Sequence, residues 1–222
     1  IPSQLSEVGK VTVTSYAQRG YVARQSLNEL VNVYSGVAMP GSAVRVVVFY
    51  DGVNEVLWKC RTENVGMGSA YEQEIRASLA VDGLSAKMVL QPALSLIKWI
   101  GDGFDNRMFN SSYSCDEDPD RSDDVARSLV NDWVSAAAVA QRNGDRFVAV
   151  LQPVAYLGRP NLNQLDLFRE EWQELAAQYQ AVYPSIRRYA QEAQIEFHDF
   201  SGVLDTGEQV YIDFCHLSPN GN

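Results

Sequence analysis

The sequence has few of the residues from which metal sites and disulfide frameworks are built. Its 222 residues include three cysteines and two histidines. Cys60, Cys115 and Cys215 match neither a CxxC metal motif nor an even set of disulfide partners, which excludes a disulfide-rich scaffold. Two alternatives stay open for Cys60 and Cys115, which bracket one long segment: buried free thiols, or a bond across that segment. A bond would suit an oxidising compartment and favour an extracytoplasmic or secreted protein.

Basic residues and long apolar runs are also scarce. Eighteen lysines and arginines stand against 28 acidic residues, which gives a formal net charge of −10. Such a surface repels nucleic acid and anionic lipid, so we expect neither as a partner. The apolar stretch at residues 87–100 is interrupted by Gln91, Pro92 and Lys98, and we expect no transmembrane segment. The acidic run at residues 115–124 predicts a solvated loop rather than a metal site.

The sequence does contain alternating strand and helix patterns. With 46% apolar residues and no linker, it predicts a single domain over residues 1–222. The runs RVVVFY (residues 45–50) and RFVAVL (residues 146–151) are continuously apolar, which is typical of strands buried on both faces of a parallel sheet. Further strands are expected at residues 11–14 and 195–198. The alternation predicts an α/β protein with helices on both faces of a parallel sheet.

The expected helices lie between these strands. Residues 25–34, 71–81, 84–100 and 165–193 show helical spacing of apolar positions. A further helix is expected to begin at Ser122, as its N-cap, and to end at Gly144.

Functional groups of such folds lie in the loops after the carboxyl ends of the strands, and three loops fit this rule. Gly20 follows the first expected strand, and Gly52 and Asn54 follow the second. Gly52 lets the backbone turn sharply, and the Asn54 amide donates hydrogen bonds without a pH-dependent charge. An ordinary turn is the alternative interpretation of this loop.

The third loop holds a carboxylate three residues before an imidazole. Asp213 can accept a hydrogen bond from one ring nitrogen of His216 and so leave the other nitrogen as a general base. His198, the second histidine, lies in a strand run without this arrangement, and we expect it to pack at the strand end.

In order and spacing, these loops resemble the sequence blocks of the SGNH (GDSL-type) hydrolases. Gly20, in QRGYVARQ, is similar to the second block of that family. GVNE at residues 52–55 is similar to the third block, Gly-x-Asn-Asp, with Glu55 in place of the usual Asp. DFCHLSPNG at residues 213–221 is similar to the fourth block, Asp-x-x-His. The resemblance runs from about Val11 to the end of the sequence.

The resemblance implies an ester hydrolase that acts on acyl or acetyl esters through a Ser-His-Asp triad. His216 would be the base and Asp213 its orienting carboxylate. Gly20 and Asn54 would supply oxyanion-hole donors, and Gly52 would shape the supporting loop. The chemistry implies no cofactor and no metal, and a small-molecule or saccharide ester as substrate.

The family's serine block, Gly-Asp-Ser, is missing from the sequence, as is a G-x-S-x-G elbow. The resemblance implies a three-layer, flavodoxin-like sheet in which the first strand lies between the second and the third. We therefore expect a chain whose first strand and serine lie upstream of Ile1, and which is incomplete at its C-terminus as well. The chain as it stands is expected to be inactive.

Three other functions stay open at this point. They are a non-catalytic, SGNH-like carbohydrate-binding protein, an acyltransferase that uses the same site, and a nucleotide- or flavin-binding flavodoxin-like protein. The last predicts a phosphate-binding loop rich in Gly, Ser and Thr after the first strand, and the sequence contains none. Aromatic residues within 65–121 (Trp99, Phe104, Phe109 and Tyr113) could roof the site, although a packed insertion is the alternative.

Overall fold

Three parallel strands form the sheet in a computed structural model of the chain, which describes residues 11–36, 45–62, 64, 112–165, 170–219 and 221. The strands are β1 (Val46–Asp51), β2 (Arg146–Leu151) and β3 (Phe197–Asp199), in the order β1-β2-β3. Both pairings are parallel, which confirms an α/β fold with a parallel sheet. The strand expected at residues 146–151 is β2 itself, and five of its six residues are buried.

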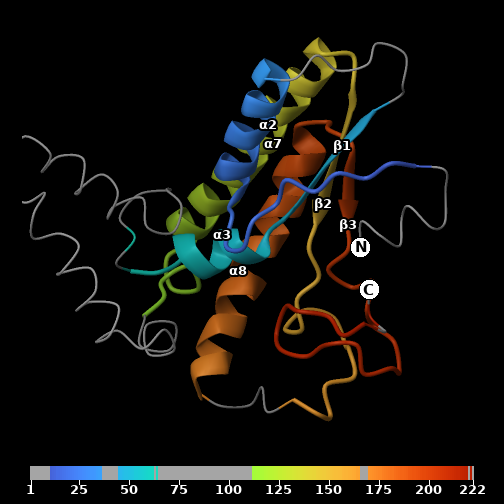
Figure 1. Ribbon diagram of the computed structural model, residues 1–222. Coiled ribbons are helices and arrows are strands. Elements are labelled where there is room, and N and C mark those ends of the chain that lie inside the picture. Colours follow the sequence, from blue (N-terminus) through green and yellow to red (C-terminus); the bar gives the residue numbers. More distant parts are fainter. Residues whose placement is uncertain are drawn as a thin grey trace, which may run out of the picture.

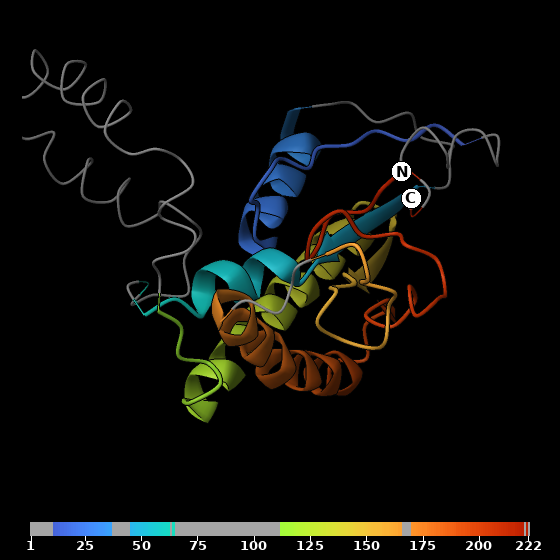
Figure 2. The ribbon, with the colours of Figure 1, turned by 90° about the horizontal axis from the view of Figure 1, so that it is seen from below.

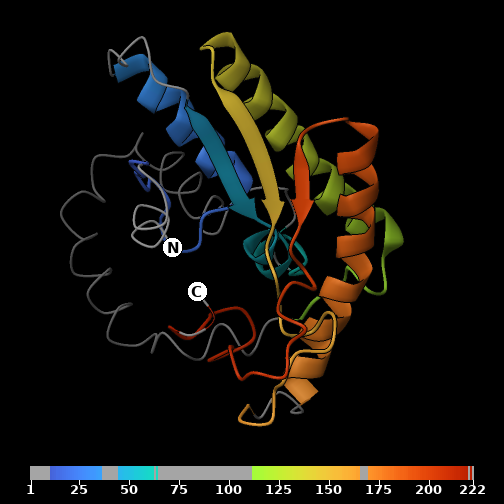
Figure 3. The ribbon, with the colours of Figure 1, turned by 90° about the vertical axis from the view of Figure 1, so that its right-hand side faces the viewer.

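Helices α2 (Ala23–Gly36), α7 (Pro119–Arg142) and α8 (Glu170–Glu192) lie on the same side of the sheet (Figures 1 and 3). A short fourth helix, α3 (Val53–Lys59), follows β1 directly. The core is formed where α7 packs between α2 and α8 against β2. Trp133 of α7 is fully buried there and contacts the ring of Phe197 in β3.

The expectation that β1 is buried on both faces is wrong. Val46, Val48 and Tyr50 are 48%, 57% and 38% exposed, whereas Phe49 and Asp51, which point to the helical side, are buried. The physical reason is that β1 is an edge strand in the described part of the chain, where no helix covers the face that carries these side chains. Helices on both faces are therefore not found among the described residues.

Several local expectations are corrected as well. Residues 11–14 form no strand, because no described strand lies beside them to complete a ladder. In β3, His198 and Asp199 are exposed, since this short strand is the other edge of the sheet. Asp118 rather than Ser122 is the N-cap of α7, and it accepts a hydrogen bond from the Arg121 N–H. The helix ends at Arg142, just before Gly144, as expected.

Other expectations fall wholly or partly outside the described residues. The helices expected at residues 71–81 and 84–100 and the aromatic residues Trp99, Phe104 and Phe109 are among these. The helix expected at residues 165–193 is observed as α8, which contains Pro184. No described helix is both long and apolar enough to cross a membrane.

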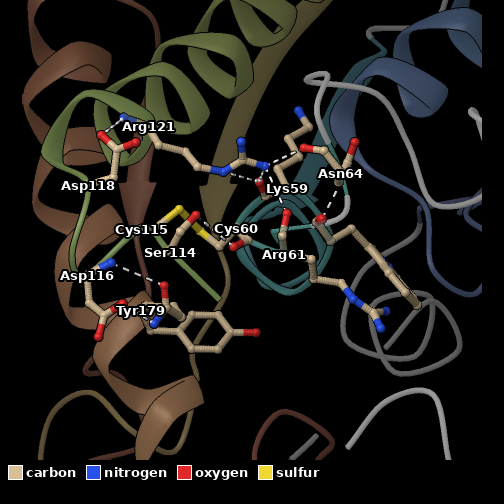
Figure 4. The surroundings of a disulfide bond; sticks show 12 residues. Lys59, Cys60, Arg61, Asn64, Ser114, Cys115, Asp116, Asp118, Arg121 and Tyr179 are labelled. Carbon is tan, nitrogen blue, oxygen red and sulfur yellow. Dashed lines mark hydrogen bonds between the residues drawn. A yellow bond between two sulfur atoms is a disulfide. The ribbon is translucent and has the colours of Figure 1, made fainter. Parts of the chain in front are cut away.

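A disulfide joins Cys60 to Cys115, so the bonded alternative for this pair is confirmed (Figure 4). The Arg121 guanidinium lies beside the bond and donates to the carbonyl oxygens of Lys59, Arg61 and Asn64. The C-terminal end of α3 is thereby attached covalently to the segment before α7, and by hydrogen bonds to the first turn of α7. Since α3 follows Gly52, this attachment also holds one end of the candidate site.

The loops that follow the strands gather at one end of the sheet. Figure 2 looks from below onto this end, where the turn into α3, the loop after β2 and the C-terminal segment lie near one another. A direct connection is the hydrogen bond from the Ala155 N–H to the Phe214 carbonyl, at 2.7 Å. Two of the loops singled out from the sequence, after β1 and after β3, therefore lie at the same end of the sheet as the loop after β2.

Candidate active site

Asp213 and His216 form a hydrogen-bonded pair in the loop after β3. The Asp213 Oδ2 atom lies 2.7 Å from His216 Nδ1. The other oxygen, Oδ1, accepts the backbone N–H groups of Cys215 at 2.9 Å and of His216 at 2.7 Å. Burial raises the pKa of Asp213, but these N–H donors and the His216 ring outweigh it and hold the pKa below its usual value. The carboxylate therefore stays ionised and orients the imidazole.

The pair is accessible on the side of the imidazole. The His216 side chain is 65% exposed and that of Asp213 is 41% exposed. Within the described part of the chain, no serine hydroxyl lies within hydrogen-bonding distance of the His216 ring. With Nδ1 occupied by Asp213, Nε2 is the atom free to take a proton.

Phe214 anchors this loop, a role that the sequence did not reveal. Its ring is buried and packs against Tyr156, Trp172 and Tyr179, while its carbonyl accepts the hydrogen bond from Ala155. The available signal was an aromatic residue within the Asp-x-x-His motif. Its packing holds Asp213 and His216 at the end of β2.

Cys215 is a free thiol beside the pair. Its Sγ lies 3.6 Å from His216 Nδ1. Burial, and then the charge of Asp213, raise the pKa of the Cys215 thiol well above its usual value. A thiol that stays protonated is a poor nucleophile, so the arrangement favours the base role of His216 over a cysteine-based reaction.

The same three side chains, Asp213, Cys215 and His216, could also surround a metal ion, since their ligand atoms lie within 4.8 Å of one another. A metal ion bound by all three would need the thiolate form of Cys215. The raised thiol pKa opposes that form.

The turn from β1 into α3 is tightly fixed. Gly52 has a φ of 128°, and a Cβ at this position would lie 2.6 Å from Leu151 Cδ1 and 3.0 Å from the Tyr183 hydroxyl. On the next residue, the Val53 N–H donates to Gln152 Oε1 at 3.1 Å, and the Val53 carbonyl accepts from the Tyr179 hydroxyl at 3.0 Å. Glycine is required here by both conformation and space.

Asn54 lies in the first turn of α3 rather than in a free loop tip, and it reaches the Gly20 turn. Its Nδ2 atom donates to the Tyr21 carbonyl at 2.8 Å. Gly20 has a φ of 80° in a turn closed by the Tyr21 N–H and the Gln18 carbonyl, at 3.3 Å. A positive φ near the end of such a turn favours glycine. The structure thus brings Gly20, Gly52 and Asn54 together.

The two halves of the candidate site are connected through the loop after β2. Val53 bonds to Gln152, and three residues later Ala155 bonds to Phe214, between Asp213 and His216. The candidate base, His216, and the candidate donors, the Gly20 backbone N–H and the Asn54 amide, therefore lie at the carboxyl end of one parallel sheet. In α/β proteins this is where ligands bind.

This chain matches no protein-family model and no curated protein sequence.

His198 differs from His216 in its distance to a carboxylate. It is exposed instead of packed as expected, because β3 is an edge strand, and its nearest carboxylate oxygen is Glu196 Oε1, 3.8 Å from Nε2. It has no hydrogen-bonded carboxylate to fix its tautomer, which makes it a natural comparison for His216.

Buried charged residues lie close to the candidate donors, and only one of them, Glu55, was noted in the sequence, where it replaces the usual Asp of the third block. Asp51, Glu55 and Lys59 are all buried at the end of β1 and along α3. Lys59 Nζ donates to Ser128 Oγ at 3.2 Å, and Asp51 Oδ2 accepts from Trp133 Nε1 at 2.9 Å. The available signal was a charged residue at every fourth position from the end of β1.

Proposed function

We propose that this protein is an ester hydrolase that acts on acyl or acetyl esters, with its nucleophilic serine in a part of the polypeptide that precedes Ile1. The observation that carries the proposal is the Asp213–His216 pair, with Nδ1 bound to a carboxylate oxygen at 2.7 Å and the ring exposed. An imidazole held in one tautomer, with Nε2 free, meets the requirement for a base that activates a serine hydroxyl.

The uncovered face of the sheet supports the finer fold, a three-layer, flavodoxin-like SGNH domain. Val46, Val48 and Tyr50 are exposed on β1, and a strand along its free edge with a helix over this face would bury them. A parallel strand there would end beside Gly52. A serine after that strand would lie at the same end of the sheet as the candidate donors.

The proposed reaction forms and then hydrolyses an acyl-serine. His216 Nε2 removes the hydroxyl proton as the serine oxygen attacks the ester carbonyl. The oxyanion receives hydrogen bonds from the Gly20 backbone N–H, the Asn54 amide and the N–H of the serine. Collapse breaks the ester C–O bond, and the proton on His216 passes to the leaving alkoxide. Water, deprotonated by His216, then releases the carboxylic acid and restores the serine.

An acceptor alcohol in place of water would make the same site an acyltransferase. The small-molecule or saccharide ester that we propose as substrate suits both reactions. Product analysis with and without an added sugar alcohol separates them, because only transfer gives a new ester.

The test is the hydrolysis of p-nitrophenyl acetate by the complete gene product, including the sequence upstream of Ile1. His216→Ala is expected to lower kcat/KM by about 10³-fold or more, because the base is lost, and Asp213→Asn by about 10³- to 10⁴-fold, because the tautomer is lost. The matched control is His198→Ala, which removes the other histidine and should leave kcat/KM unchanged. Equal activity of the His216 variant and the wild type would contradict the proposal.

The disulfide also supports a cellular location. Bonds such as Cys60–Cys115 persist in oxidising compartments, so we propose that the protein works outside the cytoplasm. Mass spectrometry of the protein from its native source, alkylated before reduction, should show one free thiol, Cys215, among the cysteines of this chain.

A further inference from the structure

Glu55 is a buried acidic residue to which the proposed reaction gives no role. It is fully buried on α3, and both of its carboxylate oxygens accept backbone N–H groups. Oε2 accepts from the Gly52 N–H at 3.0 Å, and Oε1 accepts from the Ala23 N–H at 2.5 Å, a partner 32 residues away. A buried carboxylate is costly unless its oxygens are bonded in this way, so its position is closely determined.

The two N–H groups begin two different helices. Ala23 is the first residue of α2, and Gly52 is the N-cap of α3. N–H groups at such positions have no acceptor within their own helix, and the helix dipole favours a negative group there. One carboxylate therefore joins the start of α2 to the start of α3.

Both helix starts carry a candidate oxyanion donor. Gly20 lies three residues before Ala23, and Asn54 directly precedes Glu55. Asn54 provides a second connection, since one N–H of its amide donates to the Tyr21 carbonyl at 2.8 Å. Its other amide N–H is the one that the proposed reaction uses.

We propose that Glu55 is a positioning residue, which fixes the distance between the Gly20 N–H and the Asn54 amide so that both reach one oxyanion. The proposal rests on the proposed function. Without the bond to Ala23, the segment that carries the Gly20 turn loses one of its hydrogen bonds to α3, and the Asn54 amide, which bonds to Tyr21, shifts with that segment. Displacement of a reacting group's partners by about 1 Å costs on the order of 10²-fold in rate.

Two variants of the complete gene product test this role. Glu55→Gln keeps the volume but turns an NH₂ group toward one of the two N–H donors, so only one bond survives. Glu55→Asp introduces the residue usual in the third SGNH block, whose side chain is one methylene shorter. This variant is expected to keep the hydrogen bond from the Gly52 N–H but to lose the one from the Ala23 N–H. The matched control is Glu174→Gln, because Glu174 also accepts a backbone N–H, that of Tyr113 at 3.1 Å, from an exposed position on α8.

The readouts are kcat per active site, titrated with diethyl p-nitrophenyl phosphate, and amide hydrogen exchange. We expect kcat per titrated site to fall about 10- to 100-fold in both Glu55 variants. KM for p-nitrophenyl acetate should stay within about threefold, because the donors act on the transition state. In Glu55→Asp, the Ala23 amide should lose its protection from hydrogen exchange, while the Gly52 amide keeps it. Glu174→Gln should match the wild type in both kcat and Ala23 exchange.

The outcomes separate the two proposals. A wild-type protein without esterase activity overturns the proposed function and this role with it. An active wild type whose Glu55 variants keep kcat per titrated site, even with a lower melting temperature, overturns the positioning role alone. Unchanged Ala23 exchange in Glu55→Asp overturns it too, and this measurement applies to any variant that folds.

Discussion

At the scale of single residues, Asp51 shows how burial at the end of a strand changes a carboxyl group. Burial raises its pKa to about 8, and the nearby charge of Glu55 contributes in the same direction. The Trp133 N–H and the charge of Lys59 lower the pKa, and the charge of Asp132 raises it again. Since burial dominates, Asp51 is protonated in the folded protein at neutral pH.

Asp51 therefore makes stability depend on pH. Between the usual carboxyl pKa of 3.8 and about 8, the folded protein holds a proton that the unfolded chain releases. This contribution to stability is fully present below pH 4 and is lost as the pH rises to about 8. Asp51→Asn cannot ionise, and its Oδ1 can still accept from Trp133. Its free energy of unfolding relative to the wild type should rise from pH 5 to pH 8 by on the order of 1–3 kcal/mol.

Urea unfolding of the chain at several pH values measures this difference. Asp124→Asn, at an exposed position on α7, is the control, and its curve should run parallel to that of the wild type. Parallel curves for Asp51→Asn and the wild type would show that Asp51 does not hold the proton.

At the scale of elements, the junction between β1 and α3 determines where Asn54 lies. Gly52 turns the chain with a φ of 128°, and its neighbours leave no room for a side chain. The Val53 N–H donates to Gln152 Oε1 and the Val53 carbonyl accepts from the Tyr179 hydroxyl, so hydrogen bonds fix Val53 on both sides. The first turn of α3 thus starts in one orientation.

Gly52→Ala is expected to destabilise the protein by about 2–5 kcal/mol, because a Cβ adds both backbone strain and overlap with Leu151. Gly144→Ala is the matched control. Gly144 also has a positive φ, 77°, but its Cβ would meet nothing within 4 Å, so about 1–2 kcal/mol is expected from strain alone. Chemical denaturation measures both, and equal losses would show that the contacts around Gly52 contribute little.

At the scale of the whole molecule, the disulfide connects parts of the chain that are distant in sequence. Cys60 at the end of α3 is bonded to Cys115, 55 residues later, and Arg121 reinforces the connection through three carbonyl oxygens. The bond restricts the unfolded chain more than the folded one, which is its main contribution to stability.

The double variant Cys60→Ser/Cys115→Ser is expected to lose about 2–4 kcal/mol of unfolding free energy, as is typical for a closed loop of this length. Because the Arg121 hydrogen bonds remain, we expect the folded structure around α3 to persist, with an unchanged NMR shift for the His216 ring. Cys215→Ser is the control for the loss of a thiol. A double variant as stable as the wild type would contradict the prediction.

The sequence alone determined the features that depend on local pattern. Continuous apolar runs predicted β2 and placed β1, and helical spacing located α2, α7 and α8. The three-residue spacing of Asp213 and His216 was sufficient for the pair to form, because that contact lies within one turn. The sharp backbone turn expected at Gly52 is likewise observed, with a positive φ.

Tertiary structure decided what depends on neighbours distant in the sequence. Burial of β1 on one face only, and the absence of a strand at residues 11–14, follow from which elements lie beside them, which no periodicity records. The burial that raises the pKa of Asp51 and the hydrogen bond from the Ala23 N–H to Glu55, which spans 32 residues, likewise arise from the packing of elements that are distant in the sequence. Local patterns thus gave the elements and the Asp–His pair, whereas packing decided which groups are buried, charged and held together.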